Sequence, residues 1–195
     1  MNKVQRFVVL SILLVIAWSL SGCLGRQKVS NVKNFFDDFK GYEAQVKVTL
    51  LKDSKPNVLK MTQKAQLKGT YEYILEEPTH LKGLCVVYDG NTITQEHPST
   101  GDKVVCKPSQ ARQEMLLTSF IERYKEAKDI KKETIKQDGK NLLAIEIPIE
   151  GNYKYLAYEK LYLDEMNKEP IQMMIYDKDG NITIQVDYES FKYND

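Results

Sequence analysis

The sequence predicts an α+β fold, a strongly curved, half-open antiparallel β-barrel of about eleven strands with two helices covering its concave side. Three observations lead to this prediction. Apolar and polar residues alternate with a period of two through most of the chain, which is typical of half-buried strands. Tight turns such as Asp89-Gly90 and Asp138-Gly139 join these segments, so neighbouring strands should run antiparallel. Only two amphipathic helical stretches occur, and they do not alternate with strands as in a parallel sheet.

The N-terminal stretch indicates export and lipidation. Lys3 and Arg6 give a basic start, residues 7–20 form a nearly unbroken apolar run, and residues 20–23 read Leu-Ser-Gly-Cys. A basic start, an apolar core and a small-residue cleavage site are typical of a signal peptide. The Leu-Ser-Gly-Cys motif looks like a bacterial lipobox. At such a motif the cysteine, here Cys23, receives S-diacylglycerol and N-acyl groups, and the chain is cut between Gly22 and Cys23.

This pattern defines the expected domains and location. We expect residues 1–22 to be a cleaved lipoprotein signal peptide, residues 23–29 a lipid-anchored tether and residues 30–195 one β-domain. A plain transmembrane anchor is the main alternative, but the apolar run is shorter than the roughly 20 residues that a spanning helix needs. The mature protein should therefore be anchored by lipid on the extracytoplasmic face of a bacterial membrane.

The charge balance excludes a typical nucleic-acid-binding protein. The whole chain has 28 Lys and Arg against 27 Asp and Glu, and removal of Lys3 and Arg6 with the signal peptide leaves a net charge of −1. A nucleic-acid-binding surface would need a basic patch, and none is evident along the sequence.

The first helix is predicted from an apolar stripe that begins after Ser30, a favourable N-cap residue. The stripe has the spacing of an amphipathic helix and consists of Val32, Phe35, Phe36 and Phe39. Gly41 is expected to end this helix. The phenylalanines should pack on a large apolar surface, as part of the core.

Six strands are predicted before the second helix, at residues 42–50, 59–67, 71–75, 84–88, 92–96 and 103–106. Gln63 interrupts the apolar face of the second of these strands. Pro108 and Ser109 should open the second helix, which is predicted over residues 111–128.

Five more strands follow, at residues 130–137, 142–149, 153–164, 170–176 and 182–188, and Phe191 should fix the end of the chain. A sheet of this size with one apolar face must cover that face, and the two helices are available to do so.

No pattern of catalytic or metal-ligating residues in the sequence points to a reaction or a cofactor. His80 and His97 each lie at a turn beside a proline and should be surface residues. Cys85 and Cys106 lie in strand-like runs, and the sequence leaves open whether they form a disulfide or remain free. Four tyrosines crowd one stretch, where they either pack across strands or form a binding surface, namely Tyr153, Tyr155, Tyr158 and Tyr162.

Two stretches carry a family resemblance. The first is Glu77-Pro78 followed by residues 84–88 and the turn that begins at Asp89-Gly90. The second runs from Leu161-Tyr162-Leu163-Asp164 through residues 170–181 to residues 188–191. Together they resemble the lipoprotein-sorting family of periplasmic carriers and their lipid-anchored receptors, which share the LolA/LolB-like fold. The resemblance covers essentially the whole mature chain, and motifs of this kind imply a fold more than an activity.

Among lipid-anchored members, the chain is most similar to the clostridial spore-germination lipoproteins in size, lipobox, single-domain layout and composition. This resemblance implies a non-catalytic binding module that binds and activates a spore-cortex N-acetylmuramoyl-L-alanine amidase, the enzyme that forms muramic-δ-lactam. The zinc and the chemistry would belong to that partner, and no binding residue can be transferred. The alternative is a carrier of lipids or lipoproteins that holds acyl chains in its concave cavity. The open sheet edges also permit a homodimer formed by strand exchange.

Overall fold

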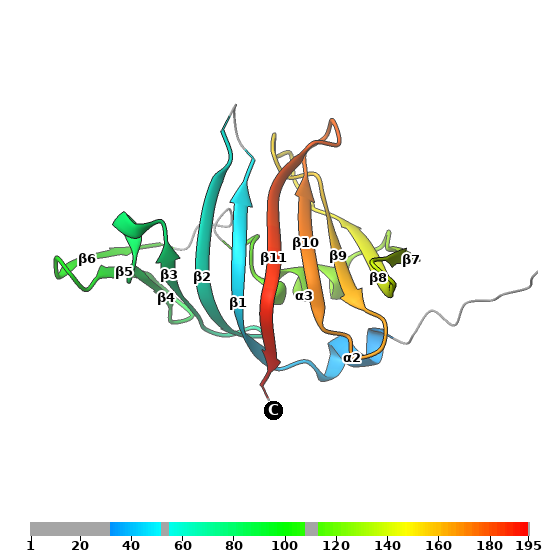
Figure 1. Cartoon of the computed structure of the whole chain (residues 1–195), viewed down its shortest axis with the longest axis horizontal. Helices are drawn as coiled ribbons and strands as arrows, with labels where there is room; N and C mark the ends of the chain where they lie inside the picture. Colours follow the sequence, from blue (N-terminus) through cyan, green and yellow to red (C-terminus); the bar gives the residue numbers. More distant parts are fainter. Residues whose placement is uncertain (1–31, 52–54, 108–112, 195) are drawn as a thin grey trace, which may run out of the picture.

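The computed structural model describes residues 32–51, 55–107 and 113–194, which form one curved sheet with two α-helices on its concave side (Figure 1). The helices are α2 (Val32–Asp38) and α3 (Leu117–Glu126), and a short 3-10 helix, η1, spans Thr79–Leu81. The strands are β1 (Gly41–Leu50), β2 (Asn57–Gln66), β3 (Tyr71–Glu77), β4 (Cys85–Tyr88), β5 (Ile93–His97), β6 (Asp102–Cys106), β7 (Lys131–Gln137), β8 (Lys140–Pro148), β9 (Tyr158–Asp164), β10 (Pro170–Tyr176) and β11 (Ile182–Tyr193).

The sheet is entirely antiparallel and is not closed. Its eleven strands lie in the order β6-β5-β4-β3-β2-β1-β11-β10-β9-β8-β7, so the first and last strands of the chain, β1 and β11, pair at the centre. Within the described residues, β6 and β7 are edge strands that do not pair with each other. The predicted half-open antiparallel sheet with two covering helices is thereby confirmed.

Alternation along the strands decides which side chains form the core. In β1, Tyr42, Ala44, Val46 and Val48 are buried against the helices, whereas the intervening polar residues face outward. The same parity holds on β9, where Leu161 and Leu163 are buried. One contiguous core therefore fills the space between the concave face of the sheet, α2 and α3.

The central pair of strands is bent by a bulge. The register between β1 and β11 shifts at Gln45/Val46, because Tyr188 pairs with Val46 and Ser190 with Gln45. The extra residue in β11 increases the local twist. The strand continues to Tyr193, beyond the predicted end at residue 188, and this extension places Phe191 against Tyr42 with ring centroids 5.4 Å apart.

Gly41 does not end the first helix as predicted; it is the first residue of β1, and α2 already ends at Asp38. A Cβ atom at Gly41 would lie 2.4 Å from the backbone oxygen of Ala65 in the neighbouring strand. Glycine is therefore required by the close approach of two strand backbones, which the local sequence does not reveal.

Two further boundaries differ from the predictions. Helix α3 begins at Leu117 rather than at residue 111, and β9 begins at Tyr158 rather than at residue 153. In the second instance, residues 150–157 form a connection in which Ala157 N–H donates to the carbonyl of Tyr176. The predicted caps Ser30, Pro108 and Ser109 lie outside the described residues.

Candidate functional site

The concave face, where a carrier of this fold would hold its cargo, is occupied by side chains from both helices. Helix α3 and the residue before it present an apolar face that is at most 2% exposed and consists of Leu116, Leu117, Phe120 and Ile121. Phe36 of α2 packs edge-on against Tyr124, with ring centroids 4.8 Å apart, and against Phe120 at 6.3 Å. The phenylalanine stripe of the first helix is therefore core, as predicted.

A buried polar contact fixes the start of α3. Gln63, the residue that interrupts the apolar face of β2, is fully buried. It accepts a hydrogen bond from the Tyr42 hydroxyl at 2.7 Å, and that hydroxyl in turn accepts one from the Leu117 N–H at 3.3 Å. Leu116, at the N-cap position, offers no capping side chain, so Tyr42 supplies the missing acceptor from the sheet. Burial raises the pKa of Tyr42 far above its ordinary value, which keeps the hydroxyl protonated.

A buried ion-pair cluster fixes the rest of α3. Arg123 donates from Nε and Nη2 to the two carboxylate oxygens of Glu159 on β9, at 2.5 and 2.7 Å. Its Nη1 lies 2.7 Å from Oε2 of Glu114. Glu159 is fully buried because it lies on the same inward face of β9 as Leu161 and Leu163. These charged side chains thus bind one another. The arrangement is typical of a buried ion-pair network that holds a helix to a sheet, rather than of acid–base catalysis.

Sequence reasoning noted the irregularity at Gln63 but did not find this cluster. The available signal was parity: Glu159 stands two residues before Leu161 on the buried side of its strand, and a carboxylate in that position requires a buried partner. The partner lies 36 residues away in the sequence, so only the tertiary fold identifies it as Arg123.

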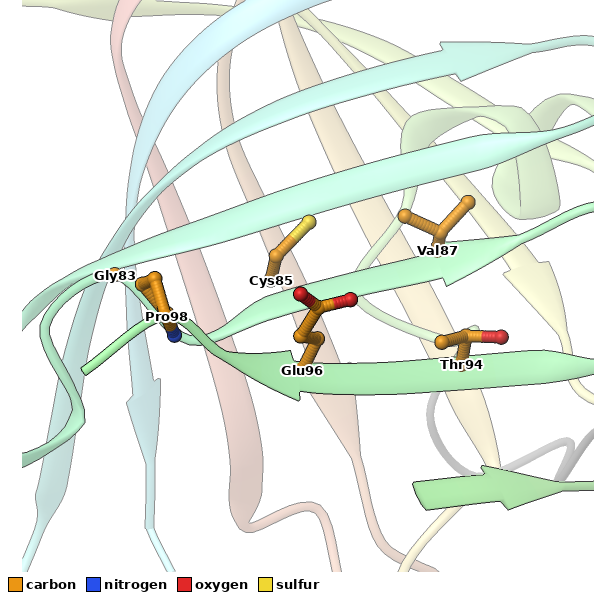
Figure 2. Close-up of a pocket in the computed structure, with 6 residues that line it drawn as sticks. All are labelled: Gly83, Cys85, Val87, Thr94, Glu96 and Pro98. Atoms are coloured by element: carbon orange, nitrogen blue, oxygen red, sulfur yellow. The ribbon is translucent and has the colours of Figure 1, made fainter. Parts of the chain in front are cut away.

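The disulfide that the sequence left open is absent, since Cys85 and Cys106 are both free thiols. Strand β5 lies between them, and Cys85 pairs with Glu96 whereas Cys106 pairs with Ile93. Figure 2 shows Cys85 on the same side of the sheet as Glu96, in a small hollow of about 230 Å³. Cys106 packs against the core on the other side. Two cysteines on opposite faces of a sheet, two strands apart, cannot be bridged without backbone movement.

The histidines lie where the sequence predicted. His80 is an exposed residue of η1, and His97 ends β5, where its Nδ1 lies 2.7 Å from the Ser99 hydroxyl. Within the described ranges, no group of three or more His, Cys, Asp or Glu side chains is arranged to hold a metal ion.

The four tyrosines between residues 153 and 162 lie in different environments. Tyr158 stacks on Tyr176 across neighbouring strands, with ring centroids 4.5 Å apart. Tyr153 and Tyr155 lie in the connection before β9 and are 41% and 42% exposed. We call Tyr153, Tyr155, Tyr158, Tyr162 and Tyr176 the aromatic corner. Tyrosines that combine exposed apolar rings with hydrogen-bonding hydroxyls are enriched in protein interfaces.

Several predictions about the N-terminus fall outside the described residues, including the signal peptide, its cleavage between Gly22 and Cys23, the lipidation of Cys23 and the tether. Across residues 32–51, 55–107 and 113–194, the structure contains no helix with the length and apolar character needed to cross a membrane.

Comparison with known proteins identifies the family. The model of the YdcC-like sporulation proteins matches residues 3–195, which is almost the entire chain. The chain belongs to the YdcC-like family of sporulation proteins. No curated protein matches this YdcC-like protein in sequence.

Solved structures show the same fold. One chain in the structure of the CwlD amidase from Clostridioides difficile in complex with the GerS lipoprotein is 23% identical, with a TM-score of 0.55, over 88% of this chain and 100% of that chain. An uncharacterized conserved protein from Thermus thermophilus is 12% identical, with a TM-score of 0.54, over 85% and 89% of the two chains. A LolA superfamily protein from Nitrosomonas europaea also matches, at 13% identity and a TM-score of 0.40, over 81% and 88%. At the level of the fold, the predicted resemblance of this YdcC-like protein to GerS is confirmed by the match to the CwlD–GerS complex.

Proposed function

We propose that this protein is a membrane-anchored, non-catalytic binding module that binds and activates a spore-cortex N-acetylmuramoyl-L-alanine amidase and is thereby required for spore germination. One observation carries the proposal: this protein matches the full length of a chain in the complex of the CwlD amidase with the GerS lipoprotein. Membership of a sporulation family supports the same cellular setting. Zinc and catalysis would belong to the amidase, and the product would be muramic-δ-lactam.

The filled concave face favours a binding module over the alternative, a carrier of acyl chains. Leu117, Phe120 and Ile121 occupy the described interior, and a hollow at the start of α3 is lined mainly by polar groups. A carrier would have to displace α3, which Tyr42 and Arg123 hold to the sheet. Native mass spectrometry of the purified protein tests the alternative directly, because a co-purified lipid would favour the carrier.

The experiment that tests the proposal is co-purification with a cortex amidase from sporulating cells, combined with analysis of the spore cortex. We expect the tagged protein to capture the amidase, and spores that lack the protein to lack muramic-δ-lactam. Normal muramic-δ-lactam in such spores would refute the germination role. The oligomeric state of the purified protein, measured by light scattering, would test the proposed strand-exchanged homodimer.

The aromatic corner is the surface that we propose for the amidase. Changing Tyr153→Ser and Tyr155→Ser together should weaken amidase binding roughly 30-fold, because exposed tyrosines at the centre of an interface contribute about 2 kcal/mol or more. Surface plasmon resonance with immobilised amidase measures the change.

A control changes two exposed apolar residues of the edge strand β6, Val104→Thr and Val105→Thr, which are 58% and 59% exposed. This variant should bind the amidase like the wild type. If the valine variant loses binding and the tyrosine variant keeps it, the interface lies at the β6 edge and the aromatic corner is the wrong surface.

The proposed anchor predicts the behaviour of Cys23→Ala. This variant should no longer incorporate radioactive palmitate and should accumulate with residues 1–22 attached, because the motif requires the cysteine sulfur as the lipid acceptor. Cys106→Ala serves as the control, since that thiol packs against the core. Palmitate labelling of Cys23→Ala at the wild-type level would contradict the anchor.

A further inference from the structure

A hollow of about 270 Å³ lies on the concave side, where the start of α3 faces the turns that follow β2 and β4. Its lining combines aromatic rings with amide and hydroxyl groups and includes Gln66, Tyr71, Tyr88, Gln113, Thr118 and Ser119. Tyr71 and Tyr88 form one wall, with ring centroids 5.2 Å apart, and the Tyr88 hydroxyl is fixed by donating to the carbonyl of Gly90. The wall is therefore held in place before any ligand arrives.

Two hydroxyl groups line this hollow and are available to a ligand. Thr118 and Ser119 are 5% and 8% exposed, yet within the described part of the chain neither hydroxyl has a hydrogen-bond partner. Each hydroxyl has one hydrogen to donate and two lone pairs to accept with. Both hydroxyl oxygens remain accessible from the hollow, so they can donate to and accept from whatever fills it.

The charges around the hollow indicate an uncharged ligand. Lys68 and Glu122 both line it, so one cation and one anion offset each other. Glu122, in the second turn of α3, also accepts the backbone N–H of Lys68 at 2.8 Å, which holds a carboxylate at the wall of the hollow. At the start of α3, the Leu117 N–H is already bonded to Tyr42. With these charges balanced, the hollow offers no net positive charge to an anionic ligand, and an acyl chain would form no hydrogen bonds with the hydroxyls.

From this geometry we propose that the hollow is a binding site for a neutral sugar ring. A sugar presents hydroxyl groups that both donate and accept, matching Ser119, Thr118 and the amides of Gln66 and Gln113. Its weakly positive C–H face suits the negative faces of the two tyrosine rings. The site is independent of the proposed amidase surface; only the choice of an N-acetylglucosamine probe rests on the proposed function, because cortex glycan contains that sugar.

The test is a titration of the full-length, isotope-labelled protein in mild detergent with the trisaccharide chitotriose, followed by amide NMR shifts. We expect saturable shifts at Gly69, Gly90 and Ser119, which line the hollow. The double variant Thr118→Val with Ser119→Ala should bind roughly tenfold more weakly, since two hydrogen bonds are lost. It should fold normally because neither hydroxyl has a protein partner within the described residues. Thr94→Val, in the hollow of Figure 2 on the other face, is the matched control and should bind like the wild type.

Three outcomes would overturn the site: the absence of saturable shifts in the wild type, equal chitotriose affinity in the double variant, or the same shifts produced by inorganic phosphate but not by chitotriose. The last outcome would mark an anion site. No amidase is present in the titration, so its failure leaves the proposed amidase partnership untouched, and failure of the amidase capture leaves the sugar site untouched.

Discussion

Replacing Arg123 with methionine is expected to lower the free energy of unfolding by about 3–5 kcal/mol at neutral pH, the range typical for removal of one partner from a buried ion pair. Glu159 is fully buried, and both of its carboxylate oxygens are bound by Arg123. Methionine keeps much of the packing but leaves that carboxylate without its partner. Urea unfolding followed by circular dichroism measures the loss of free energy. In thermal unfolding, the same loss should lower Tm by roughly 10 °C in a domain of this size.

The same variant should show a distinctive pH dependence. Burial raises the pKa of Glu159, and the hydrogen bonds and charge of Arg123 oppose that rise. Without Arg123, the folded-state pKa should rise further above the unfolded value of about 4.3. A raised folded-state pKa means that the protonated form favours folding, so the penalty is absent below about pH 4 and grows as the pH rises through the raised pKa. Equal destabilisation at pH 4 and pH 7 would contradict this account.

Glu114→Gln is the matched control for the ion-pair cluster. Burial raises the pKa of Glu114, Arg123 lowers it and the charge of Glu159 raises it again. Because its pKa is raised in the folded state, ionised Glu114 lowers the free energy of unfolding as the pH rises through that pKa. Glutamine keeps an oxygen near Arg123 and removes the charge, so stability should change by less than about 1 kcal/mol at neutral pH, in the favourable direction. If this variant were as unstable as Arg123→Met, the dominant role of the Arg123–Glu159 pair would be wrong.

Replacing Phe36 with alanine is expected to cost about 3–5 kcal/mol, the usual range for a buried phenylalanine. The ring is 1% exposed and lies edge-on to both Tyr124 and Phe120 of α3. Helix α2 has only seven residues, too few to be stable alone, so it is held to the core by this side chain. Urea unfolding should show the loss, and amide hydrogen exchange should increase throughout α2.

Phe35→Ala provides the comparison, because Phe35 is only partly buried and contacts Tyr193 with ring centroids 5.3 Å apart. Its loss should cost clearly less than that of Phe36. Equal losses from the two variants would mean that α2 is held by its general hydrophobicity and not by the contact of Phe36 with Phe120 and Tyr124 of α3.

Most of the architecture follows from local pattern. Alternation in the stretch that forms β1 predicted a half-buried strand, and turns such as Asp89-Gly90 and Asp138-Gly139 placed hairpins, because side-chain direction in a strand and backbone conformation in a turn depend on a few adjacent residues. The antiparallel pairing and the covering helices follow from the same signals. The lipobox at Cys23 is also a purely local motif, read without any knowledge of the fold.

The sequence by itself therefore determined the fold class, the buried faces and the family resemblance. Only the tertiary structure decided the requirement for glycine at position 41, the separation of Cys85 from Cys106, the pairing of Arg123 with Glu159 and the exposure of Tyr153 and Tyr155. Each of these depends on residues that are distant in sequence and brought together by strand order and register. Local periodicity predicts which face of a strand a side chain occupies, but it does not predict which distant side chain will contact it.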